Sequence, residues 1–429
     1  MDKALWLRLA KEADELRSFP LDEKTIQSAK IAFLDWLGCV IAGSRHLTPL
    51  VYALHGTAAA GDPAEATLIG SGRKTLASHA VIANGTGGRL LDVCDTIGPC
   101  GILASPAIMP AALSLSEKHS KSGRQLFEAI IVGYEVAANM DRLRPDGADM
   151  TCVNRRIEAV AAAAASARIL GLDTHAMAGA MQTAWLQGLS PPALSGMLSA
   201  YAAQAGVESS ATERSDAGVM PRSEAAVLSG ISFAGDSLAH RHVRLHAGAH
   251  GFQAAVDAII ELRSEYRLHP EDVAGIEAYV PAKALAEDAG MNPGSMQALQ
   301  KSIPYCLALA VIKGHLGPDE FFLQNLLKAP VGWLMSNTET RVNEVRSDGS
   351  SSRSEGARVV VQTRYEAAYE KTVTHPRGTF ENPASLAEIE NKFRILTAPA
   401  ISEEAASSLL ERIRLFGDET CVKGLFAGL

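Results

Sequence analysis

The amino-acid sequence predicts a mostly α protein with a smaller α+β part. Three observations support this fold class. Apolar residues recur at helical spacing through most of residues 1–240, residues 273–280 (VAGIEAYV) alternate as a β-strand, and residues 385–429 return to helical spacing. The chain has 429 residues, of which 47% are hydrophobic, so it can form two or three domains that each bury a core.

The shift in pattern places the domain boundaries. We expect a large all-helical domain over residues 1–243, a smaller α+β domain over residues 244–380, and C-terminal helices over residues 381–429 that pack back on the first domain. In the first domain, Asp22 can cap the free N–H groups of a helix that keeps one apolar face as far as Gly43. Further helices are expected at residues 74–88, 104–120, 123–140, 156–170 and 174–188.

The α+β domain is predicted from short alternating stretches with helices between them. Strands are expected at residues 273–280, 341–345 and 357–373, and the polar stretch SDGSSSRSEG predicts a turn that joins the last two. Helices are expected at residues 251–264 and 296–313. The two C-terminal helices are expected at residues 386–396 and 403–416.

Composition and charge argue against several classes of protein. The formal net charge of −8 argues against a nucleic-acid partner, because a phosphate-binding surface needs clustered Lys and Arg. Residues 1–20 mix both charge signs with apolar residues and predict an amphipathic helix instead of a secretory signal. The apolar runs are too short to span a bilayer, and the six cysteines form no CxxC pair. We therefore expect a cytoplasmic protein with reduced thiols and no membrane partner.

Residues 84–117 are the strongest candidate for the wall of a pocket. This segment combines Asp92, Asp95 and Thr96 with five glycines, a poor composition for a core. Two nearby carboxylates repel, so one of them can hold a proton near neutral pH and serve as acid or base. The alternative is structural, with Asp95 capping the following turn and Asp92 paired with Arg89.

The order of segments along the chain resembles that of the MmgE/PrpD family of dehydratases, decarboxylases and epimerases. The matching segments are residues 29–44 (AKIAFLDWLGCVIAGS), 83–96 (ANGTGGRLLDVCDT), 106–136, 161–173, 292–314 and 376–393 (PRGTFENPASLAEIENKF). The resemblance implies a large helical domain and a smaller α+β lid, as a homodimer, with the active site in the cleft between the domains. It also implies removal of a proton α to a carboxylate, followed by loss of water or CO2 or by reprotonation, without an organic cofactor.

The sequence departs from the family pattern at positions that carry chemistry. Leu103 stands where the family has a histidine before a proline, and a second family histidine falls near Cys152. A Lys-x-Leu-His-x-Gly segment of the family corresponds to residues 212–230, which carry charged residues such as Arg222 instead. At the entry to the lid, Arg244 takes the place of the family lysine.

Histidines near the lid entry are candidates for the missing acid or base. His246 and His250 lie close to the place of the family histidine, and either could transfer a proton. His242, His246 and His250 are four residues apart, so a helix would place all three on one face, as a metal site requires. Gly248 and Gly251 weaken any helix there, and we expect no metal.

A further set of polar residues would bind the substrate. They are Thr96, Arg155, Arg156, Glu158, Arg222, Arg244, Lys301 and Ser302. The planar fork of Arg155 or Arg156 can bind both oxygens of a carboxylate, and the alternative is a surface ion pair. Tyr305 is a candidate proton donor, since the family places this helix against the cleft, and the alternative is a packed aromatic side chain.

Two functions remain open from the sequence. The first is a divergent lyase or isomerase, with Asp92 or Asp95 as base or acid, Tyr305 as proton donor and arginines as clamps for a small carboxylate substrate. Because the His and Lys pattern of the family is missing, we expect a specialised metabolite and not 2-methylcitrate. The second is a non-catalytic ligand-binding protein or partner subunit on the same fold, since relaxed catalytic demand permits the loss of several proton-transfer residues.

Overall fold

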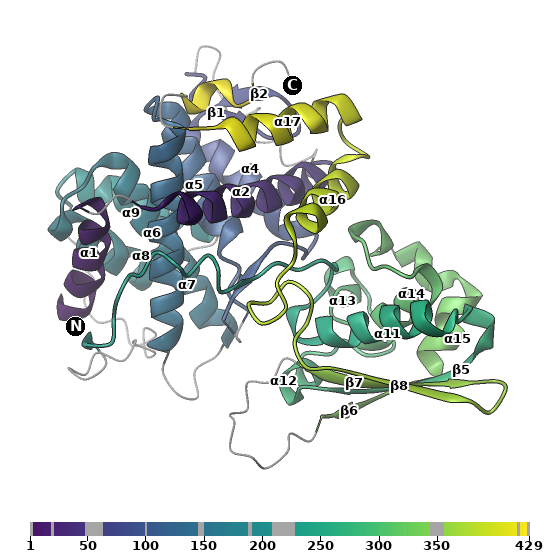
Figure 1. The fold of residues 1–429 in the computed structure, drawn as a ribbon. Helices are drawn as coiled ribbons and strands as arrows, with labels where there is room; N and C mark the ends of the chain where they lie inside the picture. The colour runs from purple at the N-terminus through teal and green to yellow at the C-terminus, as the bar shows by residue number, and fades with distance from the viewer. Residues whose placement is uncertain are drawn as a thin grey trace. The chain divides into compact units, whose positions relative to one another are not determined.

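The computed structural model shows a mostly helical chain with a small mixed sheet in its C-terminal half (Figure 1). It divides into two compact units. Unit 1 comprises residues 1–90, 94–241 and 385–429, and unit 2 comprises residues 91–93 and 242–384. The structure describes residues 3–18, 21–47, 63–98, 101–144, 150–187, 191–207, 228–321, 323–343, 356–417 and 421–426.

Unit 1 is built mainly from helices. They are α1 (Lys3–Ser18), α2 (Glu23–Ser44), α4 (Ala77–Leu90), α5 (Ser105–Lys118), α6 (Gly123–Arg142), α7 (Met150–Leu170), α8 (Thr174–Gln187), α9 (Pro192–Gln204), α16 (Leu386–Thr397), α17 (Glu403–Leu415) and the 3-10 helix η6 (Val422–Gly424). The prediction of an all-helical domain is wrong in one respect. Strands β1 (Ala66–Leu68) and β2 (Arg73–Thr75) form an antiparallel pair before α4, and a short strand β3 (Thr96–Ile97) follows it. The helix predicted from residue 74 therefore begins three residues later.

Small residues let the helices of unit 1 pack closely. Helix α7 contacts α5, α6, α8 and α9, and the alanines at 159 and 161–165 are fully buried. Gly196 of α9 lies directly on α7, because a Cβ there would come within 2.5 Å of the Ala163 nitrogen. Gly43 of α2 meets α4 in the same way, since a Cβ would lie 2.1 Å from the Gly87 carbonyl oxygen. The alanine- and glycine-rich composition is therefore what permits this packing.

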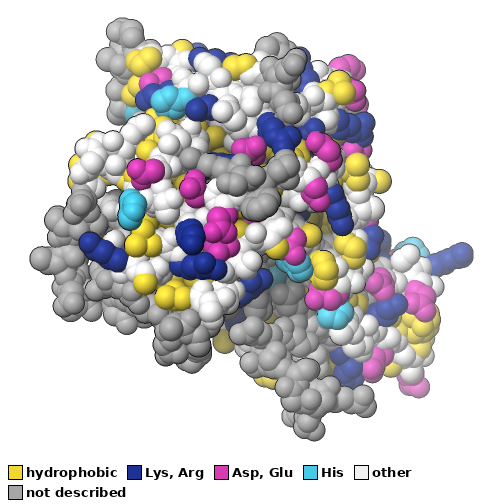
Figure 2. Space-filling model, turned by 60° about the vertical axis from the view of Figure 1, so that its left-hand side comes forward, with side chains coloured by type: hydrophobic (Ala, Val, Ile, Leu, Met, Phe, Trp, Pro, Cys, Tyr) yellow, Lys and Arg dark blue, Asp and Glu magenta, His cyan; other side chains and the backbone are white. Residues whose placement is uncertain are grey.

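The described surface carries both signs of charge. On the face shown in Figure 2, Lys and Arg side chains lie beside Asp and Glu side chains, with hydrophobic side chains scattered among them.

Among the described residues, α2 is the one helix that is long and apolar enough to cross a membrane. Most of its apolar window is buried inside the protein, as in a core helix.

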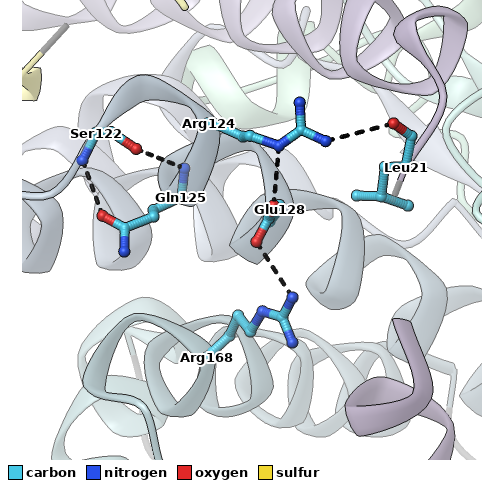
Figure 3. A network of polar contacts seen from close by, with 6 residues as sticks. All are labelled: Leu21, Ser122, Arg124, Gln125, Glu128 and Arg168. Carbon is cyan, nitrogen blue, oxygen red and sulfur yellow. Dashed lines mark hydrogen bonds and ion pairs between the residues drawn. The ribbon is translucent and has the colours of Figure 1, made fainter. Parts of the chain in front are cut away.

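Side-chain caps set where two helices of unit 1 begin, and ion pairs join α6 to α7. Asp22 caps α2 by accepting a hydrogen bond of 2.7 Å from the Thr25 N–H, which confirms the predicted start. Figure 3 shows the start of α6, where Ser122 and Gln125 form a reciprocal capping box. Glu128, one turn further, accepts hydrogen bonds from Arg124 of α6 and Arg168 of α7, and so ties the two helices together.

Unit 2 contains a four-stranded sheet with the order β6-β5-β7-β8. Its strands are β5 (Val273–Val280), β6 (Thr338–Val342), β7 (Ala357–Thr363) and β8 (Ala368–Val373), and the two-residue β4 (Arg241–His242) lies where unit 1 ends. The strand predicted at residues 273–280 is confirmed. Strands β6 and β7 do not pair with each other, because β5 lies between them, parallel to β6 and antiparallel to β7. The connecting residues 344–355 fall outside the described part.

Helices of unit 2 pack against the four-stranded sheet. They are α11 (Gln253–Tyr266), α12 (Ala282–Ala286), α13 (Met296–Leu299), α14 (Ile303–Lys313), α15 (Ala329–Ser336) and the 3-10 helices η2 (His250–Phe252), η3 (Pro270–Asp272), η4 (Pro318–Glu320) and η5 (Leu323–Leu327). Helix α11 packs on β7 and β8. The single helix predicted at residues 296–313 is divided in two, since Ser302 caps a new helix that Pro304 also favours.

Candidate functional site

A short loop in unit 2 organises the candidate site. Residues 244–250, which we call the site loop, form no α-helix and end at the first residue of the 3-10 helix η2, so no helical face holds His242, His246 and His250 together. Three successive backbone N–H groups fix the loop: Ala247 donates to the Leu316 carbonyl at 2.9 Å, Gly248 to the Asp92 carbonyl at 3.0 Å and Ala249 to the Gln300 carbonyl at 2.8 Å. These bonds hold the side chains of the site loop beside Asp92 and the start of α14.

Asp92 and Arg244 form an ion pair in unit 2. The Arg244 Nη1 lies 2.7 Å from the Asp92 Oδ1 and also donates to the Gly248 carbonyl at 2.9 Å. The Arg244 side chain is only 1% exposed, whereas that of Asp92 is 22% exposed. Asp92 has a φ of 47°, a left-handed backbone conformation that residues other than glycine rarely adopt. Such conformations cost free energy and concentrate at functional sites, where the surrounding structure enforces them.

The histidines at positions 242, 246 and 250 do not share one partner. The His246 Nε2 lies 2.8 Å from the Asp257 Oδ1, and the Asp257 Oδ2 accepts a hydrogen bond of 2.8 Å from the Arg377 N–H. His242 and His250 contact each other, with ring centroids 5.1 Å apart. Among the described residues, no three His, Cys, Asp or Glu side chains gather as they would around a metal ion.

Helix α14 places Tyr305 in the interior of unit 2. Its hydroxyl donates to the Glu320 backbone carbonyl, and burial raises the pKa of this phenol well above its ordinary value. Ser302 caps the helix and donates to the Gly290 carbonyl at 2.6 Å, while Lys301 is exposed. In this structure Tyr305 and Ser302 thus hold the start of α14 in place.

Asp95 lies in unit 1 with a different set of neighbours. Its carboxyl is buried, and the Tyr134 hydroxyl donates to its Oδ2 at 2.5 Å. The Arg241 Nε lies 3.9 Å from the same oxygen. Burial is the largest cause that raises the pKa of Asp95, and the charge of Asp35 raises it further, while Arg241 lowers it. The neighbouring carboxylate that acts on Asp95 is therefore Asp35, where the sequence suggested Asp92.

The predicted arginine wall on α7 is tied to groups within unit 1. Glu158 pairs with Arg89 of α4 and accepts a hydrogen bond of 3.2 Å from the Leu103 N–H. Arg156 donates to the Trp185 carbonyl at 2.8 Å and lies over the ring of that residue. Arg89 thus pairs with Glu158 where the sequence suggested Asp92. Arg155 is partly exposed, Thr96 is buried in β3, and Arg222 lies outside the described residues.

Two residues of the site were missed by the sequence reading. Asp257 contacts His246, and the Arg377 N–H, far away in sequence, donates to Asp257. Asp257 carries a signal that could have found it, because it is the one acid in the apolar run AAVDAII of an amphipathic helix. Arg377 contributes only its backbone N–H to this contact, so its side-chain type gives no signal.

Comparison with known families covers nearly the whole chain. Residues 7–215 match the MmgE/PrpD N-terminal domain, and residues 246–415 match the MmgE/PrpD C-terminal domain. A search of curated proteins gives no match. The N-terminal match falls on segments of unit 1 and the residues around Asp92, and the C-terminal match includes His246, Asp257 and the whole sheet.

Proposed function

The chain belongs to the MmgE/PrpD family, and we propose on this basis that it is a lyase or isomerase that removes a proton α to a carboxylate or carbonyl group. Loss of water or CO2, or return of the proton to the other face, would complete the reaction. The enzyme needs no organic cofactor for these steps, because a positioned acid and base suffice. Its substrate is a small carboxylate metabolite other than 2-methylcitrate, and it works as a cytoplasmic homodimer.

The observation that carries this proposal is the setting of Asp92. The backbone of Asp92 is held at a φ of 47°, and the buried Arg244 lies 2.7 Å from one of its carboxylate oxygens. Because the Asp92 side chain is also partly exposed, it is a fixed group that a small molecule can reach. Asp92 also lies in the segment that resembles the aspartate motif of the family. We assign the transfer of the α proton to Asp92. Asp95 and Tyr305 are less suitable, since the first is 1% exposed and the hydroxyl of the second donates a hydrogen bond to a backbone carbonyl.

The test measures deuterium entry at the α carbon. A panel of di- and tricarboxylates that includes 2-methylcitrate and cis-aconitate is incubated with the protein in D2O and followed by NMR. We expect exchange with one or more members, and neither dehydration of 2-methylcitrate nor decarboxylation of cis-aconitate. Asp92→Asn should slow the exchange by about 10²–10⁴-fold, the usual contribution of a general acid or base. Asp319→Asn, an exposed acid of the same unit, is the matched control. Exchange at the wild-type rate in Asp92→Asn would refute the assignment.

A second candidate is a non-catalytic ligand-binding protein on the same fold. The observation in its favour is that Arg244 and Tyr305, which the family resemblance points to as anion clamp and proton donor, bond to groups of the protein itself. The same panel separates the two functions. A ligand that shifts the thermal unfolding temperature but gains no deuterium supports the binding protein.

A further inference from the structure

Asp257 is a buried acid on the packed face of α11. The helix lies against β7 and β8, and the residues around Asp257 in the run AAVDAII are apolar. An isolated carboxylate in such a place would be costly, so its partners account for its presence. Each of its oxygens has one: Oδ1 lies 2.8 Å from the His246 Nε2, and Oδ2 accepts the Arg377 N–H at 2.8 Å.

The backbone donor comes from a tightly folded loop at residues 375–382. The Gly378 N–H donates to the Asn382 carbonyl at 2.8 Å, and the Gly378 carbonyl accepts from the Val243 N–H at 2.9 Å. Gly378 has a φ of 97°, and a Cβ at this position would lie 1.9 Å from the Val243 carbonyl oxygen. Only glycine therefore fits. This loop is therefore bonded to Val243, directly before the site loop, and it fixes the Arg377 N–H that orients Asp257.

This arrangement determines the tautomer of His246. An ionised carboxylate only accepts hydrogen bonds, so the Nε2 atom that faces Asp257 must carry a proton. The Nδ1 atom is then the one that exchanges protons with other groups. The ring is 16% exposed, and it lies two residues from Gly248, which donates to the Asp92 carbonyl.

From this geometry we propose that His246 is the second proton-transfer group of the site and that Asp257 is its positioning residue. The inference rests on the proposed function and completes it with an acid. In the enolisation step, Asp92 takes the α proton, and the C–H electron pair forms the C=C bond of the enol while the C=O π pair moves onto oxygen. That oxygen takes the Nδ1 proton of the His246 imidazolium, whose ring becomes neutral, while the other proton stays on Nε2, hydrogen-bonded to Asp257. Reversal of these two transfers restores both residues.

The positioning is tested by a signal that requires no substrate. With ¹⁵N-labelled histidine, the wild type should show a downfield Hε2 proton that His246→Gln removes. Asp257→Asn should move this signal upfield, because an amide oxygen is a weaker acceptor than a carboxylate. Glu261→Gln, on the exposed face of the same helix, and His315→Gln, an exposed histidine of the same unit, are the controls and should leave it unchanged. Absence of the signal in the wild type, or no movement in Asp257→Asn, would overturn the inference.

The catalytic part is tested by deuterium exchange in the same variants. His246→Gln should lower the exchange rate by about 10²–10⁴-fold. Asp257→Asn, which keeps the shape of the side chain, should lower it by on the order of 10²-fold through misplacement of the ring. If the wild type exchanges and both variants match it, this inference fails while the proposed function stands. If no panel member exchanges, the proposed function fails, and a wild-type Hε2 signal that moves in Asp257→Asn still supports the positioning of His246.

Discussion

At the scale of single residues, two aspartates three positions apart have different surroundings. Asp92 belongs to unit 2, pairs with Arg244 and keeps part of its carboxylate exposed. Asp95 belongs to unit 1, where Tyr134 and Arg241 contact it in a buried setting. Their shared motif suggests two carboxylates that repel each other. Only Asp95 is buried, so the two acids differ in their chemistry. Asp92 suits proton transfer, while Asp95 suits the internal structure of unit 1.

The raised pKa of Asp95 predicts how its removal changes stability with pH. The folded state holds the Asp95 proton more tightly than the unfolded state, so this group stabilises the fold at pH values below the ordinary aspartate pKa of 3.8. That contribution is lost as the pH rises through the higher pKa of the folded state. Asp95→Asn should therefore gain stability relative to the wild type as the pH rises from the ordinary pKa of aspartate towards neutrality. Urea unfolding across this range measures it, with Asp319→Asn as control, and a difference that stays constant or falls would contradict the expectation.

At the scale of elements, sequence periodicity predicted the helices well and the sheet order poorly. Helix α6 was expected at residues 123–140 and is observed at Gly123–Arg142, because its capping box and apolar face are local properties. The order β6-β5-β7-β8 depends on contacts between distant strands, which a single sequence does not encode locally. For the same reason a local motif can point to Asp92 as a candidate, whereas only the folded chain brings Asp257 and Arg377 together.

A prediction at this scale concerns the contact between α2 and α4. Gly43→Ala should destabilise the protein by about 1–3 kcal/mol, the usual cost of overpacking, since the new Cβ would lie 2.1 Å from the Gly87 carbonyl oxygen. Gly179→Ala in α8 is the matched control, because no atom lies within 4 Å of its Cβ position. It should stabilise the helix by about 0.5–1 kcal/mol. Urea unfolding distinguishes the two, and equal effects of both changes would show that the close approach has no energetic consequence.

At the scale of the whole molecule, unit 1 gathers three separate stretches of the chain. The last stretch contributes α16, which packs on α2 and places Lys392 2.6 Å from Asp35. Both side chains are buried. An ion pair in such a place contributes little net stability against an apolar pair of similar shape, but removal of one partner leaves a buried charge behind. Helix α16, from the last stretch of the chain, is thus attached through an ion pair to α2, from the first stretch.

Lys392→Met should therefore destabilise unit 1 by about 3–5 kcal/mol, the usual cost of breaking a buried pair. The double variant Asp35→Asn with Lys392→Met should recover much of this loss, because no unpaired charge remains. Lys371→Met removes a partly exposed lysine that pairs with Glu261 and should change stability by less than about 1 kcal/mol. Thermal unfolding measures all three, and a double variant no more stable than Lys392→Met would show that the charge of Asp35 is not the cause.

The discontinuity of unit 1 also has a consequence for the order of events during synthesis. Residues 242–384 of unit 2 are synthesised before residues 385–429, whereas α2 and Asp35 are made near the start. Domains generally fold as units from the N-terminus onward. The smaller unit can therefore complete its sheet and the His246–Asp257 contact while the larger one still lacks α16. A chain released at residue 384 would have a complete small unit, whereas its large unit would lack α16, α17 and η6.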